Sequence, residues 1–123
     1  MYELKITSQF AAAHKLRGFE GSCENLHGHN WKVEVYVTGE KLERDGLLID
    51  FRIIKEKTEK LLDELDHKFL NDLEPFISLN PSSENISRYI FESLSEELNN
   101  ENVKISKITV WESDSACASY TES

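Results

Sequence analysis

The chain has few of the features that mark a membrane, secreted or polyanion-binding protein. Its 123 residues contain no apolar run near the roughly 18 residues of a membrane span. The N-terminal residues MYELKITSQF lack the basic and apolar regions of a signal peptide. Lysine and arginine total only 14 against 23 aspartates and glutamates, so the formal charge of -9 repels nucleic acid and anionic membranes. We therefore predict a cytoplasmic protein with neither nucleic-acid nor membrane partners.

Cysteine is also scarce, with Cys23 and Cys117 as the two thiols. They could pair in principle, but a chain without an export signal normally keeps its thiols reduced, which favours thiol chemistry over a disulfide. Cys117 alternates with Ala116 and Ala118 in a predicted short strand, so we expect it to fill space rather than to react.

Apolar residues recur with period two in some stretches and at helical spacing in others, which predicts both strands and helices. The predicted elements are strands over 2–14 and 27–37, helices from 50 to about 65 and from 81 to about 99, and strands over 103–112 and 116–121. Asp50 is the expected N-cap of the first helix. A chain of 123 residues has room for one compact core, so residues 1–123 are predicted to form a single domain.

The element order ββααββ predicts the α+β class. An antiparallel four-stranded sheet with both helices on one face buries that face together with the apolar stripes of the helices. The other face and the edge strands would stay open. Because a short chain covers such surfaces most simply by self-association, we also expect a homo-oligomer.

Three of the four histidines are predicted to meet at one end of one sheet face. His27 and His29 are two positions apart in a strand and therefore point to the same side. His14 is in phase with the apolar face of the first strand, and an antiparallel hairpin would bring it alongside them. Three converging imidazoles form the ligand set of a catalytic zinc, which keeps its fourth position open. The alternatives are a polar turn with incidental histidines, or ordinary half-buried polar side chains.

Three further groups have reactive side chains, and their spacing in the sequence does not decide between two roles for each. Cys23 is either a fourth ligand that closes the metal site, or a nucleophile or acid/base beside an open metal. Asp66 and His67 either end a solvated helix, or lie in a loop where the aspartate orients the imidazole for proton transfer. Glu112 ends an inward strand face, where it either reaches solvent or receives a ligand rich in N–H donors.

The chain resembles the 6-pyruvoyl-tetrahydropterin synthase family over nearly its whole length. The matching stretches, in order, are FAAAHKL, CENLHGHN, GLLIDF, LDHKFLND, NPSSENISRYIF and VWES. Within the family, the CxxxHGH spacing is similar to the branch of 6-carboxy-5,6,7,8-tetrahydropterin synthases of queuosine biosynthesis. The resemblance implies the tunnelling fold, in which subunits form barrel-like trimers and two trimers stack into a hexamer, with active sites between subunits.

The resemblance also implies a ligand set and a reaction. It assigns His14, His27 and His29 as Zn²⁺ ligands, Cys23, Asp66 and His67 as the proton-transfer set, and Glu112 as the anchor of the pterin ring. The implied reaction converts 7,8-dihydroneopterin triphosphate to 6-carboxy-5,6,7,8-tetrahydropterin, acetaldehyde and triphosphate. The alternatives are a 6-pyruvoyl-tetrahydropterin synthase, another side-chain-cleaving enzyme of this fold, and a zinc- or pterin-binding protein without catalysis.

A triphosphate needs local cations in a chain of charge -9. The candidates are Lys15, Arg17, Lys32 and Arg88, and the sequence does not rank them.

Overall fold

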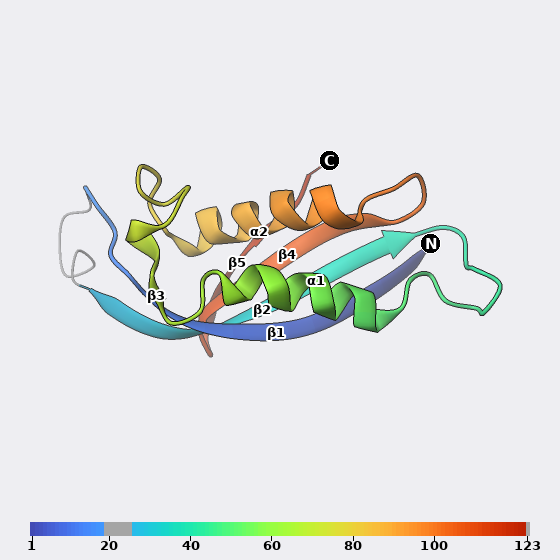
Figure 1. Ribbon diagram of the computed structural model, residues 1–123, viewed down its shortest axis with the longest axis horizontal. Coiled ribbons are helices and arrows are strands. Elements are labelled where there is room, and N and C mark those ends of the chain that lie inside the picture. Colours follow the sequence, from blue (N-terminus) through green and yellow to red (C-terminus); the bar gives the residue numbers. More distant parts are fainter. Residues whose placement is uncertain (19–25, 123) are drawn as a thin grey trace.

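The computed structural model of the chain describes residues 1–18 and 26–122. Figure 1 shows two helices lying along a long, twisted sheet. The elements are β1 (Tyr2–His14), β2 (His27–Gly39), α1 (Phe51–Asp63), β3 (Lys68–Phe69), the short 3-10 helix η2 (Leu70–Asp72), α2 (Ser83–Leu98), β4 (Lys104–Ser113) and β5 (Ala116–Tyr120). Cys23 lies outside the described residues.

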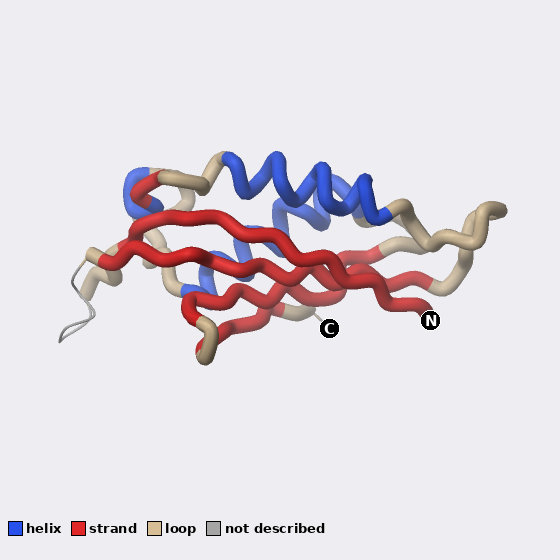
Figure 2. Tube along the Cα trace, turned by 90° about the horizontal axis from the view of Figure 1, so that it is seen from below, coloured by secondary structure: helices blue, strands red, loops and turns tan. Residues whose placement is uncertain are grey.

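The sheet confirms the α+β class and corrects the predicted strand number. Its order is β3-β1-β2-β4-β5, and both helices lie on one face (Figure 2). The prediction of four antiparallel strands was wrong, because β3 is a fifth strand and pairs with β1 in parallel. The cause is a long-range contact: His67 takes a positive φ of 57°, and its N–H donates to the Ala11 carbonyl at 2.5 Å. Lys68 and Phe69 therefore lie along the edge of β1 and pair with it.

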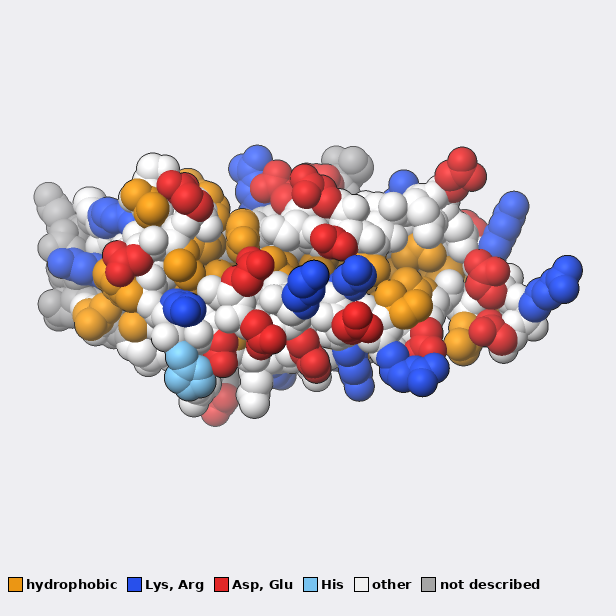
Figure 3. Space-filling view, in the orientation of Figure 1, with side chains coloured by type: hydrophobic (Ala, Val, Ile, Leu, Met, Phe, Trp, Pro, Cys, Tyr) orange, Lys and Arg blue, Asp and Glu red, His pale blue; other side chains and the backbone are white. Residues whose placement is uncertain are grey.

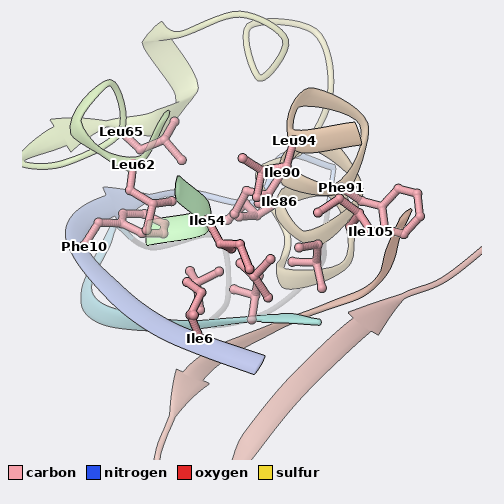
Figure 4. Close-up of a cluster of buried hydrophobic side chains, with 14 of the residues drawn as sticks. Ile6, Phe10, Ile54, Leu62, Leu65, Ile86, Ile90, Phe91, Leu94 and Ile105 are labelled. Carbon is pink, nitrogen blue, oxygen red and sulfur yellow. The ribbon is translucent and has the colours of Figure 1, made fainter. Parts of the chain in front are cut away.

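Both helices begin at polar caps and pack apolar stripes on the sheet. The Asp50 side chain accepts from a backbone N–H in the first turn of α1, as predicted, and the Ser82 side chain does the same for α2. Figure 4 shows the resulting core, with side chains of both helices meeting those of the strands. The inward side chains of β2 are fully buried: Trp31, Val33, Val35 and Val37. The period-two pattern predicted this face correctly.

In the part of the chain that the structure describes, the opposite face of the sheet carries no helix. Glu34 points to it, yet is only 8% exposed, because its carboxylate accepts from Trp111 Nε1 at 2.7 Å and from Lys5 Nζ at 3.2 Å. The indole N–H bond, followed by the lysine, lowers the pKa of Glu34. Cys117, in contrast, is exposed, so the expectation that its side chain fills space was wrong. Its strand, β5, is the last of the sheet and has a neighbour on one side only.

The surface mixes charges of both signs. In Figure 3, acidic and basic side chains alternate along the molecule, with apolar side chains exposed between them. Among the described residues, no helix combines the length and the apolar character that a membrane crossing requires.

Candidate active site

The β1–β2 hairpin places two of the predicted ligands side by side. His14 ends β1 and His29 lies near the start of β2, with ring centroids 5.1 Å apart. Both rings stand edge to face against the buried Trp31, at 4.9 and 5.3 Å between centroids. Because this rigid indole supports both imidazoles, core packing sets their relative position. His27 pairs with His14 through the hairpin backbone, and the His27 side chain lies outside the described part of the structure.

β4 brings Glu112 to the same point. This residue follows Trp111, the last residue of β4 that pairs with β2. One carboxylate oxygen, Oε1, lies 3.0 Å from Nε2 of His29 and 3.5 Å from Nε2 of His14. The other, Oε2, accepts a hydrogen bond from the Ser83 hydroxyl at 3.5 Å. The two imidazoles and the carboxylate offer ligand atoms within 4.8 Å of one another. The sequence predicted an inward carboxylate here but not its contact with the histidines.

The donor set fits a divalent cation. Nδ1 of His14 lies 2.8 Å from the Pro81 carbonyl oxygen, which only accepts, so Nδ1 carries the proton. In the neutral imidazole, Nε2 of His14 then directs its lone pair toward Glu112. A lone pair and a carboxylate repel each other unless a cation or a proton lies between them. Imidazole nitrogens with a carboxylate are ligands that Zn²⁺ and related ions accept.

Asp66 and His67 contact each other beside β1, just past the end of α1. Oδ1 of Asp66 accepts the Ala11 backbone N–H at 2.8 Å, and Oδ2 lies 2.9 Å from Nδ1 of His67. The Ala11 bond, followed by the histidine, lowers the pKa of Asp66. The His67 side chain is 82% exposed. An aspartate held in this way orients the imidazole and leaves its Nε2 directed away from the carboxylate.

A hollow of about 530 Å³ joins the two groups of residues. Its lining includes His29, which lies beside His14 and Glu112, and His67, which contacts Asp66. Ala11, Ala13 and Gly28 also line it, and a Cβ added at Gly28 would meet no described atom within 4 Å. Small side chains on the two neighbouring strands therefore keep this surface open, with room for a small-molecule ligand.

The four basic side chains considered for binding a triphosphate differ in their contacts in the structure. Lys32 lies 5.1 Å from an indole centroid on the sheet face without helices, and Arg88 forms an ion pair at 3.3 Å on the surface of α2. The Arg17 guanidinium donates to a backbone carbonyl. Lys15 is exposed and directly follows His14.

The lowered pKa of Asp66 leads to a prediction about pH. Because the folded-state pKa lies below the unfolded value of about 4, ionised Asp66 stabilises the fold above that pH. The contribution is lost as pH falls through the folded-state pKa. We expect the difference in melting temperature between wild type and Asp66→Asn to be largest near neutral pH and to shrink below about pH 4. Thermal unfolding at a series of pH values measures it.

Asp63→Asn is the matched control, since it removes an exposed carboxylate of α1 that makes no contact with Ala11. A stability difference for Asp66→Asn that stays constant between about pH 7 and about pH 3 would contradict the proposed charge effect.

Comparison with known proteins connects this geometry to one family. The model of the family described as 6-pyruvoyl tetrahydropterin synthase matches residues 3–123. The chain is 30% identical over 144 aligned residues to 6-carboxy-5,6,7,8-tetrahydropterin synthase of Haemophilus influenzae, covering 99% of this chain and 100% of that protein. It is 36% identical over 105 residues to dihydroneopterin monophosphate aldolase of Pyrococcus furiosus, covering 85% of this chain and 84% of that protein.

A solved structure supports the same fold. The structure of Caenorhabditis elegans 6-pyruvoyl tetrahydropterin synthase superposes with a TM-score of 0.88 at 29% identity, covering 99% of this chain and 96% of that chain. The likeness confirms the subunit architecture of the tunnelling fold that the sequence motifs implied.

Proposed function

The chain belongs to the 6-pyruvoyl tetrahydropterin synthase family. From that premise we propose that it converts 7,8-dihydroneopterin triphosphate and one water to 6-carboxy-5,6,7,8-tetrahydropterin, acetaldehyde and triphosphate, in queuosine biosynthesis. The family consists of pterin synthases, enzymes that act on small-molecule pterins. The observation that carries the proposal is the convergence of His14, His29 and Glu112 at the end of the β1–β2 hairpin. The name of the Haemophilus influenzae relative supports this branch of the family.

We propose Zn²⁺ as the cofactor, with His14, His27 and His29 as its ligands. When bound, the ion supplies Lewis-acid polarisation of the hydroxyl groups on the pterin side chain. The chain itself orients the imidazoles, through Trp31 beneath both described rings. Glu112 accepts hydrogen bonds from the N–H donors of the pterin, because an ionised carboxylate has only acceptor sites.

Proton transfer is assigned to Cys23 and to His67. Asp66 holds Nδ1 of His67, so Nε2 is the nitrogen that takes up or gives the proton at the substrate side chain. The Cys23 thiolate serves as the second acid/base. A positioned group of this kind contributes about 10²–10⁴-fold to the rate.

We further propose that the enzyme is a cytoplasmic hexamer, a dimer of trimers with active sites between subunits. Two observations support self-association. Among the described residues both helices lie on one face of the sheet and leave the other face without a helix (Figure 2), and the His67 side chain is 82% exposed in the single chain although its Nδ1 lies 2.9 Å from the Asp66 carboxylate.

Product analysis tests the proposed reaction. We expect zinc-loaded protein and 7,8-dihydroneopterin triphosphate to give acetaldehyde and 6-carboxy-5,6,7,8-tetrahydropterin in equal amounts, measured by coupled reduction of the aldehyde and by chromatography of the pterin. A retained three-carbon side chain would assign the chain to 6-pyruvoyl-tetrahydropterin synthases instead. Cleavage of the monophosphate in preference to the triphosphate would favour the chemistry named for the Pyrococcus furiosus relative. No turnover would favour a zinc- or pterin-binding protein.

A further inference from the structure

A single asparagine holds the segment of chain that enters α2. Asn85 is the third residue of this helix. Its side-chain amide donates to the Asn80 carbonyl at 2.9 Å, and its backbone N–H donates to the Ser82 hydroxyl at 3.1 Å. These two partners lie on either side of Pro81. Asn85 therefore fixes the chain immediately before and immediately after that proline.

Asn80 extends this restraint to the residues that follow β1. Its side-chain oxygen accepts the Arg17 backbone N–H at 2.8 Å, and its amide donates to the Arg17 carbonyl at 2.9 Å. The side chain thus satisfies both backbone groups of one residue, as a neighbouring strand would. Residues 80–82 are consequently tied both to α2 and to the chain leaving His14.

The restrained segment presents one carbonyl to the ligand cluster. The Pro81 oxygen accepts the Nδ1 proton of His14 at 2.8 Å, in a site where His14 is 3% exposed. A neutral imidazole carries its proton on one nitrogen only, so this bond keeps Nε2 of His14 deprotonated. If the carbonyl moved away, the proton could shift to Nε2, the nitrogen that lies 3.5 Å from Glu112.

The residue type at position 85 indicates more than helix capping. The third position of a helix commonly carries glutamate or glutamine in a capping box, and a negative charge there is favourable to the helix dipole. A carboxylate has no proton to donate to the Asn80 carbonyl, whereas the Asn85 amide has. The amide therefore serves the contact with residue 80.

We propose that Asn85 is a positioning residue of the metal centre: by holding residues 80–82 it keeps the Pro81 carbonyl on Nδ1 of His14, and so keeps Nε2 of that imidazole ready for a divalent cation. The inference rests on the proposed function in taking His14 to be a metal ligand. Outer-shell contacts of this kind typically change metal affinity by about 10- to 100-fold.

The substitution Asn85→Asp tests the proposal with little change in shape. We expect it to weaken Co²⁺ binding by about 10- to 100-fold, measured by competition with a chromophoric chelator. A loss of Co²⁺ affinity is informative, because a new negative charge near the site would by itself strengthen cation binding. The helix should remain, since an acidic side chain in its first turn is favourable. Co²⁺ affinity within about twofold of wild type would overturn the proposal.

Asn102→Asp is the matched control. The Asn102 amide donates to the Lys41 carbonyl at 2.8 Å, and its oxygen accepts backbone N–H groups of Glu40 and Lys41 at 3.0 Å each. Asn102→Asp therefore removes a hydrogen bond from a side-chain amide to a backbone carbonyl, as Asn85→Asp does. The bond lies in the loop between α2 and β4, at the other end of α2 from the site (Figure 1). We expect Asn102→Asp to leave Co²⁺ affinity unchanged. An equal loss in both variants would indicate a general structural effect and overturn the specific role.

A second measurement needs neither a metal nor a folded variant. Long-range ¹H–¹⁵N spectra of the metal-free wild type, at a pH where imidazole is neutral, should show His14 as the Nδ1–H tautomer. The Nε2–H form would overturn the proposal. If the wild type showed the expected tautomer but bound no Co²⁺, the proposed metal function would fail while the tautomer assignment stood.

Discussion

His27→Ala is expected to remove the metal from the protein and to abolish turnover. Without this side chain, the predicted zinc site keeps two imidazoles, an incomplete set for a Zn²⁺ that also binds substrate. Zinc content after dialysis should fall from about one per chain to near zero. Added Zn²⁺ should raise the melting temperature of the wild type but not of the variant, because a ligand stabilises only the state that binds it.

Two control variants separate the loss of metal from the loss of catalytic activity. His67→Ala removes an imidazole that is paired with Asp66 rather than with the ligand cluster, so it should keep its zinc and lose activity. Glu112→Gln should also keep its zinc if the three histidines are the ligands. A fully zinc-loaded His27→Ala would contradict the three-histidine site and indicate that Glu112, 3.0 Å from His29, supplies the third ligand.

Cys23→Ala is expected to lose turnover by about 10²-fold or more while keeping one zinc per chain. The reason is that a positioned acid/base acts on the substrate, whereas metal retention depends on the imidazoles. Steady-state kinetics, zinc content and pterin binding on the same preparation measure the three properties. Oligomeric state, followed by light scattering, should stay that of the wild type.

The second thiol provides the control for Cys23. Cys117→Ala changes an exposed side chain on β5, so activity and zinc content should both stay at the wild-type level. An active Cys23→Ala enzyme would rule out the proton-transfer role. Loss of zinc together with activity would instead make Cys23 a ligand and the metal site a closed one.

Local sequence patterns predicted most elements of the fold. The alternation in 2–14 and 27–37 predicted β1 and the start of β2, and β2 then continues to Gly39. Asp50 caps α1 as predicted, although the helix ends at Asp63 rather than near residue 65. These features follow from period and capping, which depend on residues close together in the chain.

The fifth strand was not predictable from such patterns. β3 is two residues long and has no alternation to detect. It exists because His67 adopts a positive φ and donates to the Ala11 carbonyl, a contact between segments far apart in the chain. The same contact decided that Asp66 and His67 lie as a pair beside β1.

By itself, the sequence determined the side of the sheet to which His14 and His29 point, because side chains alternate strictly along a strand. Only the tertiary structure decided which of these side chains touch. The register of β1, β2 and β4 and the packing on Trp31 bring His14, His29 and Glu112 together, while Lys32 lies on the opposite face. Such distances depend on long-range pairing and core packing, which no local pattern encodes.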